Sequence, residues 1–295
     1  DLPCLMSVFR YKSIKGNQMN LYEDQFSQEY DFPIVETPSK ILIIASTGRC
    51  GSHMLGHALH KTEAFGYPLE YANLANLNEW KKKLKTDNLQ ETIAELKKRR
   101  TSTNGVFGIK IHYSHIKQFG GFEKVLECFP DAYYILLSRE NVLKQAVSLS
   151  IASQTGGWIS GQKRVCNDPK YDFNHIDESL RNIILDNASW RYTLAANGCN
   201  YIEMDFDNIC NNLADSLESI ASFVGCKIDK TKIPKEQITK KQSNQRNTEW
   251  VAQFIADIDK NKELLCDLKT SFFTKVKRKL SKLFEKISYI NPGEA

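Results

Sequence analysis

The chain has 295 residues, of which 41% are hydrophobic, 25% charged and 11% aromatic, with 40 Lys and Arg against 35 Asp and Glu. This composition is too hydrophobic for a disordered chain, and no run of about 18 consecutive apolar residues predicts a membrane span. The net charge of +5 comes from residues 269–295, which hold seven Lys and Arg against two Glu. Since the body of the chain is neutral, the charge argues against a general nucleic-acid binder.

The chain opens with a polar segment and continues with a strand, a loop and a helix. Residues 1–38 predict an irregular arm. Residues 41–46, Ile-Leu-Ile-Ile-Ala-Ser, are apolar and β-branched, which is typical of a buried parallel strand. A loop with two glycines follows, and then a helical pattern from Ser52. This order predicts the first unit of a nucleotide-binding α/β fold.

The same alternation continues along the chain. Amphipathic helices are predicted near 76–86, 89–100, 141–154 and 174–196, and up to Gly225. Further strands are predicted at 106–111, 132–137 and 201–204. Strands that alternate with helices predict an α/β fold with a mostly parallel sheet. We therefore expect one domain over residues 39–260, with a basic tail, 261–295, after it.

Residues 47–53, Thr-Gly-Arg-Cys-Gly-Ser-His, have the features of an anion-binding loop. Unpaired backbone N–H groups and the helix dipole favour an anion at a helix start, and Gly48 and Gly51 allow its close approach. Ser52 and His53 add donors, and Arg49 adds a forked charge. The loop lacks the Gly-Lys-Ser/Thr of nucleoside triphosphatases, so it suits an anion held without a metal. The alternative is a strand, turn and helix with incidental glycines.

Arg139 ends the third predicted strand, where open α/β sheets bind ligands. Ser148 follows about two and a half turns along the next helix, so the two side chains can clasp a second phosphate. Taken alone, Arg139 is equally well explained as a surface arginine.

Five segments in chain order carry a resemblance. They are Thr47–Ser52, Gly66–Tyr71 (Gly-Tyr-Pro-Leu-Glu-Tyr), Phe107–Lys110 (Phe-Gly-Ile-Lys), Arg139–Trp158 and Lys241–Trp250. Together they resemble the bacterial trehalose 2-sulfotransferase family, also called LPS or nodulation-type sulfotransferases, over about residues 40–255. Each motif is weak alone, and their common order makes the likeness specific. The chain departs from the family pattern at Cys50, where Thr or Ser is expected, and at His53, where Thr is usual.

The resemblance implies a P-loop-like, nucleotide-kinase-like three-layer fold, commonly a homodimer. It implies transfer of a sulfuryl group from PAPS (3′-phosphoadenosine 5′-phosphosulfate), without a metal, to a hydroxyl of a carbohydrate, glycolipid or other small acceptor. The donor's 5′-phosphosulfate would bind residues 47–53, and its 3′-phosphate Arg139 and Ser148. The residues assigned to the donor are Thr47, Gly48, Arg49, Cys50, Gly51, Ser52, His53, Arg139, Ser148 and Gln242.

The resemblance also makes Glu70 the base for the acceptor hydroxyl, and a partly buried carboxylate with a raised pKa suits that task. The alternative is a glutamate that caps the next helix. Arg49 would neutralise charge on the bridging oxygen, and His53 either assists or fills space. Lys110 is either a ligand contact or a salt-bridge partner. His112 and His115 are rival bases, and Tyr71 and Trp158 either line a sugar cleft or belong to the core.

The tail has an amphipathic pattern from Ser271 to Ile290, with lysines opposite an apolar face. It predicts either a helix on an anionic membrane or partner, or a helix that covers the domain. The eight cysteines form no Cys-x-x-Cys pair, which favours free thiols and a cytoplasmic location.

Two other functions remain open from the sequence. One is a metal-dependent nucleotide or sugar kinase, which the missing Gly-Lys-Ser/Thr disfavours. The other is a non-catalytic nucleotide-binding protein anchored by its tail.

Overall fold

The computed structural model describes residues 23–159, 162, 164–235 and 245–258. The chain divides into two compact units, residues 1–251 and 252–295. The sheet and the candidate site belong to the first unit. The tail, residues 1–22 and Gln242 lie outside the described residues.

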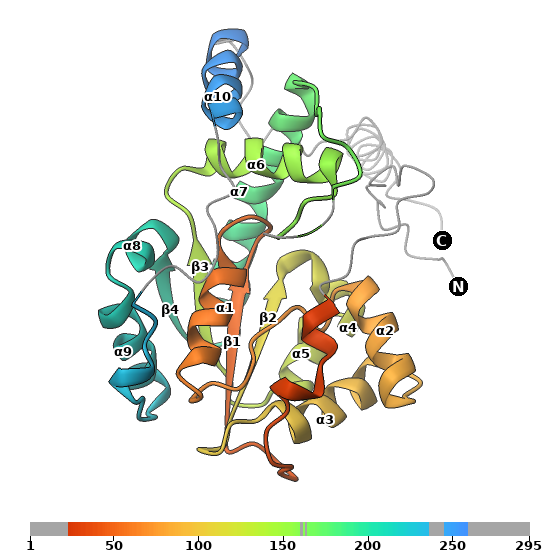
Figure 1. Cartoon of the computed structure of the whole chain (residues 1–295), viewed down its shortest axis with the longest axis vertical. Coiled ribbons are helices and arrows are strands. Elements are labelled where there is room, and N and C mark those ends of the chain that lie inside the picture. The colour runs from red at the N-terminus through yellow and green to blue at the C-terminus, as the bar shows by residue number, and fades with distance from the viewer. Residues whose placement is uncertain (1–22, 160–161, 163, 236–244, 259–295) are drawn as a thin grey trace, which may run out of the picture. The chain divides into compact units, whose positions relative to one another are not determined.

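Four parallel strands form the sheet of the first unit (Figure 1). They are β1 Lys40–Ser46, β2 Val106–His112, β3 Tyr133–Ser138 and β4 Asn200–Asp205, in the order β2-β1-β3-β4. β1 is central, paired with β2 on one side and with β3 on the other. The described part of the chain therefore confirms the predicted parallel sheet.

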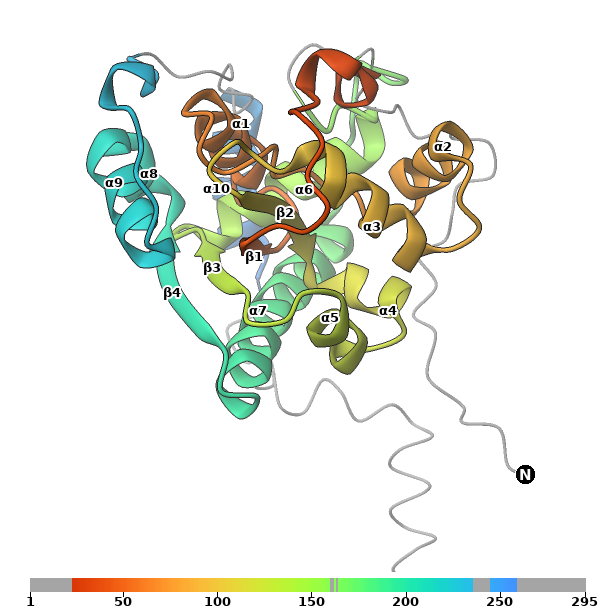
Figure 2. The same cartoon turned by 90° about the horizontal axis from the view of Figure 1, so that it is seen from below.

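Helices cover both faces of this sheet, because the strands are apolar on both. In β1, Ile41 and Ile43 pack into one core cluster, and Leu42 and Ile44 into another. The helices in the first cluster are α2 Leu74–Leu84, α3 Leu89–Arg100, α4 Ile116–Phe119, α5 Phe122–Cys128 and α7 Phe173–Ala196. Those in the second are α1 Ser52–Lys61, α8 Phe206–Asn211 and α9 Leu213–Val224. The result is the three-layer arrangement expected, with α7 and α9 on opposite faces (Figure 2).

Two helices complete the set. α6 Val142–Thr155 follows β3 and packs against α7, and α10 is Gln245–Asp257. Short 3-10 turns occur at Glu23–Phe26, Gln28–Tyr30, Tyr113–His115 and Lys230–Lys232. None of the helices in the described ranges is long and apolar enough to span a membrane.

The predicted elements match the structure except in three regions, one of which is α10, where no helix was predicted. The helix expected before Gly225 is two helices, because Asn212 between them has non-helical angles (φ −134°, ψ 53°). α4 and α5 were not predicted, since they are only four and seven residues long and too short for a clear period.

The described part of the arm contains two short 3-10 turns, and a buried arginine fixes it to the domain. Arg100 of α3 donates to the carbonyls of Gln25 and Ser27, both at 3.0 Å, and its Nε lies 2.9 Å from Asp31 Oδ1. Its guanidinium also lies over the ring of Trp80, 5.3 Å from the centroid. Residues 23–35 thus form part of the folded unit.

Candidate active site

The site lies at the carboxyl ends of the strands. Ser46, the last residue of β1, is paired with His112 at the end of β2, and Ser138 at the end of β3 with Asp205 of β4. After β1 the chain moves to β2 on one side, and after β3 it moves to β4 on the other side. The direction of the strand order therefore reverses between β1 and β3. Such a switch point is where open α/β sheets bind ligands.

The loop between β1 and α1 has a constrained backbone. Gly51, the N-cap residue of α1, has φ 93°, and a Cβ there would lie 2.0 Å from the Phe206 ring. Only glycine fits this position. Gly51 has no side chain to accept from the first-turn N–H groups of α1, so the N-cap residue adds no side-chain cap at this helix start.

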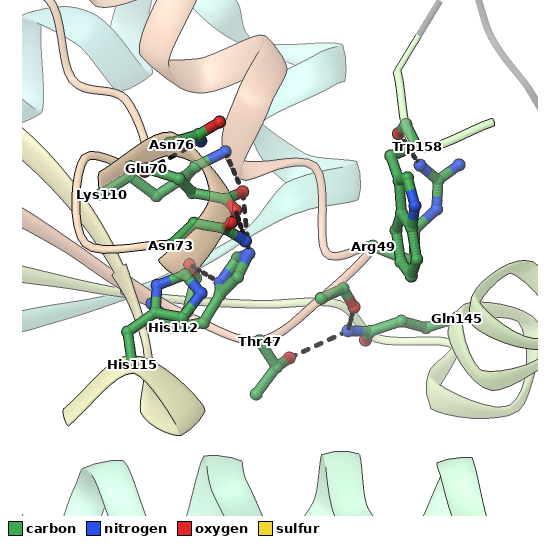
Figure 3. A network of polar contacts seen from close by, with 12 residues as sticks. Thr47, Arg49, Glu70, Asn73, Asn76, Lys110, His112, His115, Gln145 and Trp158 are labelled. Carbon is green, nitrogen blue, oxygen red and sulfur yellow. Dashed lines mark hydrogen bonds and ion pairs between the residues drawn. The ribbon is translucent and has the colours of Figure 1, made fainter. Parts of the chain in front are cut away.

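Arg49 is held in place from α6 and from the loop that follows it. Its φ is 65°, a left-handed conformation that costs a non-glycine residue roughly 1–2 kcal/mol. Its Nε donates to Ser148 Oγ at 3.1 Å. Its NH1 donates to the Trp158 carbonyl (Figure 3). Burial, and then repulsion from Arg139, lower the pKa of Arg49 to about 10.

Arg139, at the start of the loop after β3, is mostly buried and lies over the Phe206 ring, 5.5 Å from its centroid. Its Nε is 3.8 Å from Asp207 Oδ2. Ser148 contacts Arg49, and its expected partnership with Arg139 stays a prediction. Two arginines that repel each other at a helix start favour a bound anion, which relieves the repulsion.

Glu70 reaches the same edge because its segment pairs with β2. The Leu69 carbonyl accepts from Lys110 N at 2.9 Å, and Asn76 Nδ2 donates to the Glu70 carbonyl at 3.0 Å. Glu70 Oε1 then lies 2.7 Å from Lys110 Nζ and 3.0 Å from His112 Nε2 (Figure 3). The other imidazole nitrogen, Nδ1, lies 2.9 Å from Ser46 Oγ. Lys110 is thus a salt-bridge partner of Glu70.

The pKa of Glu70 runs opposite to the sequence-based expectation. Burial raises the pKa, but the charge of Lys110 and the contacts of His112 outweigh it, so the pKa lies well below its usual range. The predicted rise was wrong because it considered burial without these two partners. Glu70 is a carboxylate at neutral pH, ready to accept a hydrogen bond or a proton.

Three histidines near Lys110, namely His53, His57 and His115, are neutral at pH 7. Burial, followed by repulsion from Lys110, lowers the pKa of His53 to about 2 and that of His57 to about 4. Their Nε2 atoms are 3.0 Å apart. Burial, and then His112, lower the pKa of His115 to about 3. His53 therefore offers hydrogen bonding without a positive charge.

Tyr71 lies in the core and away from any ligand surface. It is 0% exposed, its ring packs beside Trp80 and Phe107, and its hydroxyl donates to the Tyr67 carbonyl. We therefore leave it out of the acceptor site. Trp158 is half-buried in the loop after α6, and its carbonyl accepts a hydrogen bond from Arg49.

Sequence reasoning overlooked site roles for Gln145 and Phe206. Gln145 is a fully buried polar side chain on α6, and its Nε2 donates to Thr47 Oγ1 at 2.9 Å and to the Gly48 carbonyl at 2.7 Å. A polar residue between apolar neighbours on a buried helix face was the available signal for it. Phe206 carries no local signal, because its role depends on contacts with Gly51 and Arg139, which lie far away along the chain.

The residues of the site lie at the carboxyl ends of β1, β2 and β3. Among the described residues, no group of three or more His, Cys, Asp or Glu is placed to hold a metal ion. The site therefore consists of a helix-start loop, two arginines and a carboxylate held by a lysine and a histidine.

Comparison with known proteins places this arrangement in a family. Residues 41–257 match the Stf0 sulphotransferase family. A trehalose 2-sulfotransferase of Mycobacterium tuberculosis (strain ATCC 35801 / TMC 107 / Erdman) is 28% identical over 130 residues, covering 42% of this chain and 46% of that protein. The chain thus aligns with about half the length of this relative.

Solved structures with lower likeness include a sulfotransferase from Alicyclobacillus acidocaldarius, at 13% identity and TM-score 0.43, covering 75% of this chain and 92% of that one. Mouse sulfotransferase SULT7A1 complexed with PAP gives 14% identity and TM-score 0.40, covering 86% and 79%. The assignment itself rests on the sequence match, which runs from β1 through the end of α10. The chain belongs to the Stf0 sulphotransferase family.

Proposed function

We propose that the protein is a sulfotransferase that moves the sulfuryl group of PAPS to a hydroxyl of a small acceptor and releases adenosine 3′,5′-bisphosphate. The observation that carries the proposal is the family match over residues 41–257, which includes the loop, Glu70 and Arg139. The relative's printed activity is the same reaction class.

The chain's own groups suit a donor with two anionic ends. The first-turn N–H groups of α1 and the Arg49 guanidinium would receive the phosphosulfate, and Arg139 would receive the 3′-phosphate. Burial and the nearby Arg139 lower the pKa of Arg49 to about 10, so a bound anion would be favoured beside these two cations.

Glu70 would accept the proton of the acceptor hydroxyl. The acceptor oxygen then bonds to sulfur, the bond from sulfur to the bridging oxygen breaks, and its electron pair leaves on the phosphate of the bisphosphate. Arg49 and the backbone donors stabilise that charge, since such transfers depend on positioning and electrostatics more than on covalent steps.

His112 is a weaker candidate for the base than Glu70. Its two ring nitrogens already face Ser46 Oγ and Glu70 Oε1, so it has no free nitrogen for a substrate in this arrangement. His115 is 8% exposed, and its Nδ1 faces the His112 N–H. Glu70 would use Oε2 for the acceptor, and among the described residues Asn73 Nδ2 lies 3.5 Å from this oxygen.

For the acceptor we propose a carbohydrate hydroxyl. The relative's printed name specifies trehalose, a disaccharide. Trp158, half-buried beside Arg49, offers an aromatic surface of the kind that packs against a sugar ring.

Calorimetry tests the donor. Adenosine 3′,5′-bisphosphate is expected to bind without metal, and ATP with magnesium to bind at least tenfold more weakly. Magnesium-dependent ATP binding without bisphosphate binding would favour the kinase alternative and overturn the proposal. Transfer of labelled sulfate from PAPS to a panel of mono- and disaccharides then identifies the acceptor. No transfer to any hydroxyl compound, despite bisphosphate binding, would favour a non-catalytic nucleotide-binding protein.

A further inference from the structure

Gln145 is the buried side chain that connects α6 to the loop. Its Nε2 donates to the Gly48 carbonyl at 2.7 Å and to Thr47 Oγ1 at 2.9 Å, across 97 and 98 residues of sequence. A carbonyl can only accept, so the amide nitrogen must face Gly48, which fixes the orientation of the Gln145 amide. The second hydrogen of the same nitrogen then goes to Thr47.

These two contacts set how the loop presents its donors. In a trans peptide the carbonyl and the next N–H point in opposite directions, so turning the Gly48 carbonyl towards α6 turns the Arg49 N–H away from it. Thr47 Oγ1 accepts from Gln145, and its own hydroxyl hydrogen is therefore available to another acceptor. One side chain of α6 therefore holds both the Gly48 carbonyl and the Thr47 hydroxyl oxygen in place.

The loop conformation that Gln145 holds is a strained one. Arg49 adopts φ 65° immediately after the Gly48 carbonyl, and such strain persists only where the surroundings fix it. Gln145 is itself poorly satisfied, because its Oε1 is buried without a hydrogen-bond partner among the described residues. A side chain selected for stability alone would be apolar here. This points to a role in the loop.

We propose that Gln145 is a positioning residue that sets the anion loop in its binding conformation before the donor arrives. It acts through the Gly48 carbonyl and the Thr47 hydroxyl and does not touch the reacting atoms. The inference rests on the proposed function in that it takes the loop to be the PAPS site.

Gln145→Met tests this role, because methionine keeps the length and volume of the side chain and removes the amide. We expect the dissociation constant of adenosine 3′,5′-bisphosphate to rise about tenfold or more, and the KM for PAPS to rise with it. The KM for the acceptor should change less than twofold. A purely structural role would instead lower the thermal midpoint and affect both substrates alike.

Gln154→Met is the matched control on the same helix. The Gln154 amide also bridges backbone groups, donating to the Lys170 carbonyl at 2.9 Å and accepting from Lys170 N at 2.8 Å, away from the loop. It should leave the affinity for the bisphosphate within twofold of the parent. A loss equal to that of Gln145→Met would contradict a specific role for Gln145.

Thr47→Val separates the two contacts. If Gln145 acts partly through the Thr47 hydroxyl, the double variant binds the bisphosphate more tightly than the product of the two single effects predicts. Fully multiplicative effects would overturn the part of the inference that concerns Thr47.

Hydrogen exchange of the loop amides, without ligand, makes the test independent of the donor. Residues 48–52 should exchange several-fold faster in Gln145→Met than in the parent and in Gln154→Met. If the parent binds no bisphosphate, the proposed function fails, and this measurement still decides the role of Gln145. Parent-like exchange together with parent-like affinity would overturn the inference.

Discussion

Glu70 combines burial, which disfavours its charge, with two basic neighbours that restore it. The resulting pKa, well below the usual value, favours a permanently ionised carboxylate. Such a group is a weak base in water but a well-oriented one here, since Lys110 and His112 hold its Oε1 and leave Oε2 towards the site. Orientation rather than basicity is then its main contribution.

Glu70→Gln removes the base and keeps the shape of the side chain. We expect the rate of sulfuryl transfer to fall by about 10²–10⁴-fold, as for other positioned bases, with bisphosphate affinity within twofold of the parent. Steady-state kinetics and calorimetry measure the two quantities. Glu79→Gln, at a partly exposed position on α2, is the control. A parent-like rate in Glu70→Gln would show that another group takes the proton.

Lys110→Met tests the cause of the lowered pKa. A base with a depressed pKa stays active as the pH falls until that pKa is reached, so the acid limb of the parent pH–rate profile should lie below about pH 4.5. Without Lys110 the burial effect on Glu70 is less opposed, and the acid limb should move to higher pH. An unmoved limb would mean that the rate does not report the ionisation of Glu70.

At the level of elements, the loop from β1 to α1 depends on packing from α8. Phe206 opens α8 and fills the space over Gly51, and the Arg139 guanidinium lies over the same ring. One aromatic ring therefore contacts both of the proposed anion elements. α8 therefore supports the proposed donor site, although no motif in its sequence predicts this.

Gly51→Ala should disturb this junction severely. The methyl group meets the Phe206 ring at 2.0 Å in a backbone with φ 93°, so we expect a loss of about 2–4 kcal/mol in the free energy of unfolding. Bisphosphate binding should weaken at least tenfold. Gly198→Ala, where φ is 61° and no atom lies within 4 Å, isolates the backbone cost at about 1 kcal/mol. Equal losses in both variants, measured by denaturant unfolding, would exclude a steric role for Phe206.

For the whole molecule, the sequence predicted what is encoded locally. The apolar run 41–46 and the glycine loop after it are contiguous, so β1 and the start of α1 were found correctly. The contacts of Glu70 were not, since Lys110 and His112 come 40 or more residues later. The same limit applies to Gln145, whose partners precede it by almost 100 residues. Pairings at such separations leave no periodic pattern in a single sequence.

Donor binding should stabilise the whole first unit, because the loop joins elements from both faces of the sheet. At a bisphosphate concentration 100 times the dissociation constant, the gain is about 2.7 kcal/mol, which corresponds to a rise of roughly 5–10 °C in the thermal midpoint. Differential scanning calorimetry checks this. Arg139→Met should lose most of the rise, and a full rise in that variant would remove Arg139 from the donor site.

The central position of β1 affects how the protein is made. Of the four strands β1 is synthesised first, but its neighbours in the sheet begin only at residues 106 and 133. The donor to the Ser46 carbonyl, the indole of Trp190, is synthesised later still. At 5–20 residues per second, roughly 5–20 s pass between Thr47 and Gln145 leaving the ribosome. Until β2 is complete at His112, the apolar strand β1 has no neighbouring strand and is prone to aggregate. We therefore expect the nascent chain to depend on chaperones until α6 emerges. The loop after β1 is synthesised early, but Gln145 of α6, which bonds to it, is synthesised almost 100 residues later.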